Sequence, residues 1–151
     1  HDAGRVEAQF ADDPRVIPVR NPDYPDGMFT SVRRGAEAAL AAGAGEAVFI
    51  ALGDMPAIDP GTYNILLKRF AAFPAAGREC RAVRPAFAGG TGHPVLVSRG
   101  LLEKIPGFPP DASMRKVFAV FGRPGDVPVG DPGVLRDIDT PEDYAGLTAV
   151  P

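Results

Sequence analysis

The sequence predicts an α/β fold, because a helical pattern, a buried strand and a second helical pattern follow one another along the chain. The first helix is indicated by apolar residues at i, i+4, i+7 and i+8, which are Val32, Ala36, Ala39 and Leu40. The run Val48–Leu52 is apolar without alternation, which is typical of a parallel strand covered on both faces. A second helical face contains Tyr63, Leu66, Leu67 and Phe70. We therefore expect helices packed on a mostly parallel sheet.

The first half of the chain contains turn and capping signals that set the expected boundaries. Arg15–Val19 is a short β-prone run, and the Pro- and Gly-rich residues 21–27 indicate an irregular loop. The boundaries that we expect are Thr30 or Ser31 as the cap of the first helix, Gly43 and Gly45 as its end, and Asp59 with Pro60 at the start of the second.

The second half of the chain has shorter elements. The expected strands are Arg81–Phe87, His93–Val97, Asp126–Val129 and Val134–Ile138, and the expected helices are Leu101–Ile105 and Met114–Phe121. A final helix begins at Thr140, because Pro141 suits the first turn and Glu142 and Asp143 complement the positive end of the helix dipole.

Bulk composition narrows the class of protein. A chain of 151 residues, 45% of them hydrophobic, can bury one core, so residues 1–151 are expected to form a single domain. The net charge of -3 argues against a nucleic-acid partner. Cys80 is the only cysteine, which excludes an intramolecular disulfide and fits the cytoplasm. The apolar run 47–52 is too short to cross a bilayer and no leader opens the chain, so we expect no membrane partner.

Two carboxylates are candidates for a metal site. Asp54 follows the buried strand, where open α/β sheets bind their ligands, although an Asp there can also bind nearby backbone amides. Asp137 and Asp139 share one face of a strand-like segment, and ordinary helix initiation is the alternative interpretation of residues 137–143. Mg²⁺ prefers one or two carboxylates with waters and phosphate oxygens, so Asp54 and Asp139 would suffice if the fold brings them together.

Two further motifs could contact a ligand. Gly27–Ser31 combines a flexible backbone with two hydroxyl groups at a helix N-terminus, which suits a phosphate, a ribose or a base, although a simple cap has the same pattern. His93 follows a glycine loop, where it could donate to a ligand or only bind the main chain. A His-rich zinc site and a Cys-His nucleophile are poorly supported, because no second internal histidine is present.

Four blocks, in this order and spacing, resemble the molybdenum cofactor cytidylyltransferase-like family. They are Asn21–Tyr24 with Gly27–Ser31, then Gly53–Pro56, Gly92–Leu96 and Asp137–Tyr144. The resemblance implies a Rossmann-related, glycosyltransferase-A-like three-layer sandwich. It also implies transfer of a nucleoside monophosphate, with CMP favoured, from a nucleoside triphosphate to a phosphorylated pterin of the molybdopterin type, with release of pyrophosphate.

The resemblance also assigns roles to individual residues. It implies that Asp54 and Asp139 hold Mg²⁺, with Asp54 and His93 in the catalytic site. The residues implied to line the nucleotide and acceptor sites are Asn21, Gly27, Thr30, Ser31, Gly53 and Gly92. The family pattern Gly-Asp-x-Gly-Ala-Arg is only partly kept, since residues 110–115 retain Asp111 and Arg115 without the glycines.

The family's opening strand and glycine-rich triphosphate loop are not found in residues 1–151. We therefore expect an N-terminally truncated domain that lacks its first strands, has little activity alone, and exposes strand edges. Such edges favour a homo-oligomer or a strand-swapped dimer. The alternatives are a non-catalytic remnant that binds a nucleotide or a protein and, less favoured, a sugar-phosphate nucleotidyltransferase.

Overall fold

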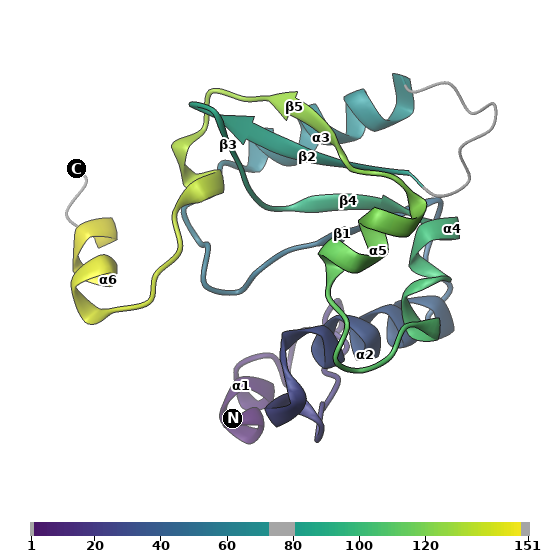
Figure 1. Ribbon diagram of the computed structural model, residues 1–151. Coiled ribbons are helices and arrows are strands. Elements are labelled where there is room, and N and C mark those ends of the chain that lie inside the picture. The colour runs from purple at the N-terminus through teal and green to yellow at the C-terminus, as the bar shows by residue number, and fades with distance from the viewer. Residues whose placement is uncertain (1, 73–80, 149–151) are drawn as a thin grey trace.

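The computed structural model describes residues 2–72 and 81–148 and confirms the predicted α/β layering (Figure 1). Within these residues one sheet has the order β1-β4-β2-β3, and β5 pairs with β2. The strands are β1 Ala47–Ile50, β2 Ala82–Phe87, β3 Gly90–Thr91, β4 Val95–Ser98 and β5 Gly125–Pro128.

The sheet is mixed in direction. Strand β4 is antiparallel to both of its neighbours, with Val97 opposite Val48 in β1 and Leu96 opposite Val83 in β2. Strand β2 is parallel to β5 and antiparallel to β3. Strands β1, β2 and β5 therefore point in the same direction. One end of the sheet therefore contains the carboxyl ends of β1 and β5 and the loop that enters β4.

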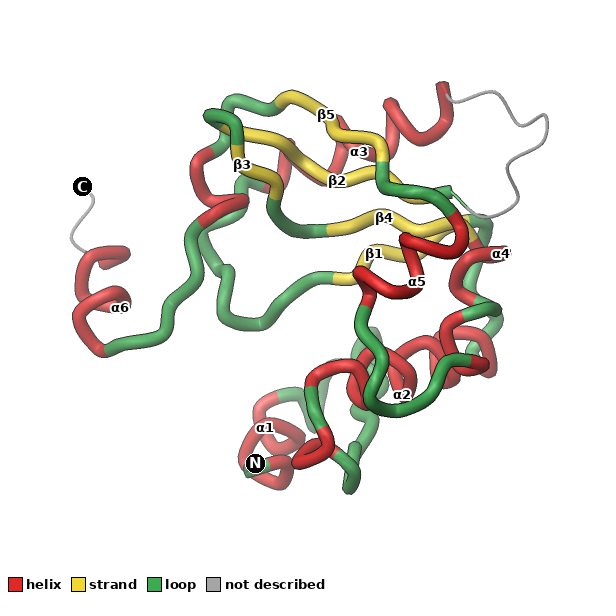
Figure 2. The backbone as a smooth tube through the Cα atoms, viewed as in Figure 1, coloured by secondary structure: helices red, strands yellow, loops and turns green. Residues whose placement is uncertain are grey.

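Helices cover both faces of the sheet, which gives three layers (Figure 2). One face packs against α2 (Met28–Ala41), α4 (Arg99–Leu102) and α5 (Met114–Phe121), and the other packs against α3 (Pro60–Ala72). Successive β4 residues alternate between the two cores, because Val95 and Val97 join the first and Leu96 joins the second. This alternation explains why all four residues of β4 are buried.

The remaining elements lie at the margins of these layers. Helix α1 (Ala3–Gln9) lies near α2, and α6 (Pro141–Thr148) stands to one side of the sheet at the end of an extended segment (Figure 1). Short 3₁₀ helices span Tyr24–Asp26, Ile105–Gly107 and Pro132–Leu135. Among the described residues, every helix is too short to cross a lipid bilayer.

Two expected strands are absent from the structure. Arg15 lies in a turn and residues 16–19 have no regular structure, because no described strand pairs with them through a ladder of hydrogen bonds. Residues 134–138 form no strand either, and Val134 belongs instead to the 3₁₀ helix Pro132–Leu135. Asp131 starts this helix by accepting a hydrogen bond from the Gly133 N–H at 2.8 Å, and Pro132 fits its first turn.

The predicted cap of α2 is wrong by several residues. The helix begins at Met28, and Gly27 occupies the cap position with φ 117°, which glycine adopts without strain. Thr30 therefore lies within the first turn. Gly43 follows the end of the helix with φ 78°, as expected of a C-terminal glycine.

The expectation of a parallel Val48–Leu52 strand covered on both faces is also corrected. Strand β1 spans Ala47–Ile50, its only described neighbour is the antiparallel β4, and its residues are half-buried. Both faces do meet a core, since Val48 and Ile50 join one cluster and Phe49 the other. The apolar run therefore correctly indicated that both faces are covered. Burial on both faces does not determine whether the neighbouring strand is parallel or antiparallel. Cys80 lies outside the described residues.

Candidate functional site

The loops that follow β1 and β5 and the loop that enters β4 meet at one end of the sheet. One backbone hydrogen bond joins the two segments that carry the candidate carboxylates. The N–H of Ile138 donates to the carbonyl oxygen of Asp54 at 2.8 Å. Because Asp137 and Asp139 flank Ile138, this bond brings the segment that carries them beside the loop after β1. All three aspartates are exposed, so their carboxylates are accessible to a ligand from solvent.

Asp139 immediately precedes a well-capped helix. The Thr140 hydroxyl donates to the Asp143 carboxylate at 2.7 Å, and the Asp143 N–H donates back to the Thr140 hydroxyl at 3.2 Å. The N–H groups of Thr140 and Asp139 also donate to the Asp143 carboxylate, at 2.9 and 3.3 Å. The Thr140 hydroxyl is the main reason that the pKa of Asp143 lies below its ordinary value. This reciprocal capping fixes the backbone at Asp139 and confirms the predicted start of the final helix.

His93 lies on the wall of a cationic cavity. Its Nδ1 is 3.4 Å from the Ile50 carbonyl oxygen, and its backbone N–H donates to the Val134 carbonyl at 3.2 Å. The cavity has a volume of about 620 Å³, and its wall includes His93, Arg84, Arg115 and Arg123 beside apolar groups that include Met114 and Phe118. It can therefore hold a ligand that combines an apolar body with negative charge.

The arginines of this cavity differ in their surroundings. Arg84 donates from Nε to the Asp126 carboxylate at 2.7 Å and has a side chain that is only 23% exposed. Arg115 and Arg123 are exposed, and no ion pair to either is found among the described residues. These two guanidinium groups are the free cations of the cavity wall.

The predicted nucleotide-contacting residues at the start of α2 are bonded to one another. The Asn21 side-chain amide donates to the Thr30 hydroxyl at 2.8 Å and to the Ser31 hydroxyl at 2.9 Å. Thr30 is only 4% exposed, and its hydroxyl donates to the Gly27 carbonyl at 2.7 Å. Ser31 is exposed. The cluster therefore braces the loop onto the helix, and a nucleotide role for Asn21, Thr30, Ser31 and Gly27 stays a prediction.

The two remaining predicted glycines have different environments. A Cβ at Gly92 would lie 1.7 Å from the Val134 carbonyl oxygen, so close backbone packing requires glycine there. A Cβ at Gly53 would meet no atom within 4 Å, so the loop before Asp54 leaves open space at this position. The ligand roles of both glycines stay predictions.

The carboxylates of the Asp54 loop and the 137–139 segment suit a metal ion that needs few protein ligands. In the part of the chain that the structure describes, no three His, Cys, Asp or Glu side chains gather closely enough to hold a metal ion. A site at the Asp54 loop would therefore use two carboxylates, one from this loop and one from the 137–139 segment. Mg²⁺ suits such a site, because it keeps several waters and binds substrate phosphates.

Sequence reasoning missed Asp131, whose carboxylate joins its own segment to the start of α3. It accepts from the Asp59 N–H at 2.9 Å, the Thr62 hydroxyl at 2.7 Å and the Gly133 N–H at 2.8 Å. The Asp-Pro-Gly sequence at 131–133 is a capping signal that could have marked the last of these bonds. The two bonds to α3 join residues about 70 positions apart, and no local pattern reports them.

The fold of the chain is similar to that of a solved structure. The chain superposes on the crystal structure of 4-diphosphocytidyl-2C-methyl-D-erythritol synthase with a TM-score of 0.59 and 18% identity. The match covers 97% of this chain and 74% of that chain. It confirms the glycosyltransferase-A-like α/β fold that the sequence predicted.

The family follows from the sequence. The model of the MobA-like NTP transferase domain matches residues 3–129, and the chain belongs to this family. Asp131 and the segment with Asp137 and Asp139 lie beyond the matched residues.

Two relatives have named activities. The chain is 32% identical over 139 residues to the molybdenum cofactor cytidylyltransferase of Escherichia coli (strain K12), which covers 92% of this chain and 66% of that protein. It is also 32% identical over 139 residues to the phosphoenolpyruvate guanylyltransferase of Sanguibacter keddieii, which covers 89% of this chain and 45% of that protein. The chain thus spans less than two thirds of either relative's length.

Proposed function

We propose that the protein transfers a nucleoside monophosphate from a nucleoside triphosphate to a phosphorylated pterin of the molybdopterin type, with release of pyrophosphate. The observation that carries this proposal is the 2.8 Å bond from the Ile138 N–H to the Asp54 carbonyl. It unites the two carboxylate segments that a Mg²⁺-dependent transferase of this family would need. The similarity to the Escherichia coli cytidylyltransferase supports the pterin acceptor and CTP.

Asp54 and Asp139 would hold Mg²⁺ through one carboxylate each, leaving other coordination positions for water and phosphate oxygens. When bound, Mg²⁺ would offset negative charge on the triphosphate and orient it. The capped α6 keeps the backbone of Asp139 in place, and the bond from Ile138 keeps the backbone of Asp54 in place. The protein would thus contribute alignment and charge balance, which dominate phosphoryl-type transfer.

The cationic cavity suits the acceptor. Its apolar groups, including Phe118 and Met114, can contact a flat ring system, and Arg115 and Arg123 can bind the phosphate of the same molecule. His93 lies on the wall of this cavity and would donate to the acceptor rather than act as a nucleophile.

The reaction needs no covalent intermediate with the protein. An oxygen of the acceptor phosphate would attack the α-phosphorus in line, forming a new P–O bond. The bond from the α-phosphorus to the bridging oxygen would break, and pyrophosphate would leave with that electron pair. The acceptor phosphate is already anionic, so a general base would contribute little.

Metal binding tests the proposal directly. Mn²⁺ binding to residues 1–151 can be followed by electron paramagnetic resonance in the presence of CTP. The Asp54→Asn and Asp139→Asn variants are each expected to weaken Mn²⁺ binding at least about tenfold, because each removes one of two charged ligands. Asp12→Asn is the matched control, since Asp12 is also exposed and lies outside the site.

An Asp54→Asn protein that binds Mn²⁺ as well as the unmodified chain would remove Asp54 from the site. In a version of the protein with measurable turnover, Asp54→Ala should abolish Mg²⁺-dependent pyrophosphate release while circular dichroism stays unchanged. Competition between CTP and GTP in the same assay tests the nucleotide preference. Tighter binding of GTP would contradict the choice of CTP and favour the activity named for the second relative.

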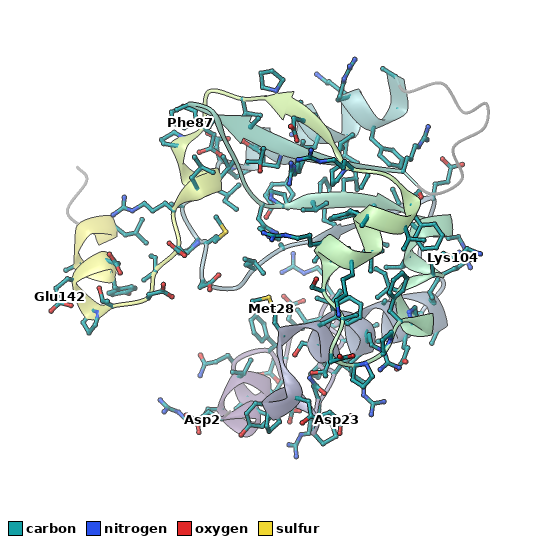
Figure 3. All side chains as sticks on the ribbon, in the orientation of Figure 1. Asp2, Asp23, Met28, Phe87, Lys104 and Glu142 are labelled. Carbon is teal, nitrogen blue, oxygen red and sulfur yellow. The ribbon has the colours of Figure 1, made fainter. Side chains whose placement is uncertain are left out.

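We also propose that the protein associates with itself through β1. Only β4 pairs with this strand among the described residues, so the other edge of Ala47–Ile50 offers unpaired backbone groups. A groove of about 300 Å³ runs beside it, with a wall that includes Val48 and Ile50 from β1 and Val32 from α2. Met28, 73% exposed, also borders this groove at the start of α2 (Figure 3).

A further inference from the structure

We propose that Asp131 is a positioning residue that holds the Asp54 loop against the segment that carries Asp139. This inference rests on the proposed function for its purpose, because the two loops matter together only if their carboxylates share a ligand. The contacts themselves do not depend on that function.

The Asp131 carboxylate connects the end of the Asp54 loop to the segment that follows β5. Its Oδ2 accepts hydrogen bonds from the Asp59 N–H and the Thr62 hydroxyl, and its Oδ1 accepts one from the Gly133 N–H. Thr62 is only 2% exposed, so its hydroxyl has little access to water as an alternative partner. Losing the carboxylate would leave a buried donor unpaired, which the folded state tolerates poorly.

Close backbone packing at Gly133, two residues further along the chain, reinforces this connection. A Cβ at Gly133 would lie 2.2 Å from the Ala57 carbonyl oxygen and 2.6 Å from its carbon. The backbone of the 131–138 segment therefore lies directly against the middle of the Asp54 loop. Because a backbone group, rather than a flexible side chain, occupies this space, the two segments cannot slide past each other without losing the contact.

The same segment also forms hydrogen bonds to His93 and to Asp54 itself. The Val134 carbonyl accepts from the His93 N–H at 3.2 Å, and the Ile138 N–H donates to the Asp54 carbonyl at 2.8 Å. Residues 131–138, here called the clamp segment, thus contact the loop 51–59 at Asp54, Ala57 and Asp59, and the His93 loop through Val134. Asp131 is the charged group that fixes the contact at Asp59.

The order of these contacts explains how Asp131, which does not touch the ligand, can fix the position of Asp139 relative to Asp54. Asp131 anchors the clamp segment to α3, which is packed on the sheet through Leu66 and Phe70. With this end fixed, the Ile138–Asp54 bond at the other end joins two constrained backbones. Without it, the segment is free to move away from Asp54 and to take Asp139 with it.

Amide hydrogen exchange and Mn²⁺ binding together test the proposal on residues 1–151. Asp131→Asn keeps the shape of the side chain but replaces one acceptor oxygen with an NH₂ group. Thr62→Val removes one buried donor and provides a second variant if Asp131→Asn does not fold. The matched control is Ser98→Ala, because Ser98 is also a buried hydroxyl, 6% exposed, that accepts from backbone N–H groups.

Ser98 is a suitable control because it lies at the end of the sheet opposite to the Asp54 loop. It pairs with Ala47 at the start of β1, whereas Ile50 at the end of β1 leads towards Asp54. Loss of the Ser98 hydroxyl should lower the free energy of unfolding without changing the contacts of the clamp segment. Both Asp131→Asn and Thr62→Val are expected to raise the exchange rate of the Ile138 amide at least about tenfold above that in Ser98→Ala, and to weaken Mn²⁺ binding.

Ile138 exchange that rises no more than in Ser98→Ala would overturn the proposal. Faster Ile138 exchange with unchanged Mn²⁺ affinity would also overturn it, because the loops would then move without affecting the site. Failure of the proposed function gives a different result, in which Asp54→Asn leaves Mn²⁺ binding intact while Ile138 exchange still responds to Asp131→Asn.

Discussion

Gly92→Ala probes the closest backbone contact near the site. A Cβ at position 92 would lie 1.7 Å from the Val134 carbonyl oxygen and 2.7 Å from its carbonyl carbon. To open the first contact to the 3.0 Å that real Cβ atoms keep, either the glycine loop or the buried Val134 backbone must move. This movement strains the His93 N–H bond to the same oxygen, which is 3.2 Å long.

The expected loss of stability is the sum of two effects. Forcing a methyl group into a packed interior costs about 1–3 kcal/mol, and the lost hydrogen bond costs about 0.5–1.5 kcal/mol. We therefore expect the free energy of unfolding to fall by about 1.5–4.5 kcal/mol. The measurement is urea unfolding followed by circular dichroism, with the slope unchanged and the midpoint lowered.

Gly35→Ala is the matched control and should act in the opposite direction. Gly35 lies within α2, and a Cβ there would meet no atom within 4 Å. Because alanine favours a helix over glycine, this variant should be more stable by up to about 1 kcal/mol. A Gly92→Ala protein within about 0.5 kcal/mol of the unmodified chain would refute the contact on which this reasoning depends.

Three further outcomes are expected. The Thr140 hydroxyl lowers the pKa of Asp143, so the capping bond should stabilise the fold above about pH 4 and be lost as the pH falls through the lowered pKa. An NMR titration should therefore find a midpoint for Asp143 below the ordinary value of an aspartate, and a midpoint at or above that value would contradict the capping role. Arg115→Gln should weaken binding of a phosphorylated pterin about tenfold by removing a charge-assisted bond, whereas Lys116→Gln, which lies outside the cavity wall, should not. Finally, solution X-ray scattering should detect a dimer or a larger assembly through the free edge of β1, and a monodisperse monomer would count against it.

The elements with strong local signals were predicted well. Met114–Phe121 forms a helix with the expected bounds, and Thr140 with Pro141 starts the final helix. Asp59 accepts the Gly61 N–H at 2.6 Å, as expected of the cap of α3. In each case the controlling interactions are within four residues in the chain, so residue types and spacing suffice to predict them.

The strand predictions succeeded only where a partner exists. The β-prone run Arg15–Val19 has the composition of a strand but no described neighbour, and Val134 enters a 3₁₀ helix that Asp131 caps. A strand forms only with hydrogen bonds to a second segment, and the residues of the strand do not determine where that segment lies. The direction of β1 relative to β4 was missed for the same reason.

Residue order and spacing were enough to predict the α/β class, the family and the candidate carboxylates. Ordered motifs and apolar periodicity are properties of the chain, and they are the same before and after folding. The folded chain was needed to find that Ile138 bonds to Asp54, that Arg123 joins Arg115 in one cavity, and that Asp131 accepts a bond from Thr62. These contacts join residues far apart in the sequence, so they are set by how the sheet and its loops pack rather than by any local pattern.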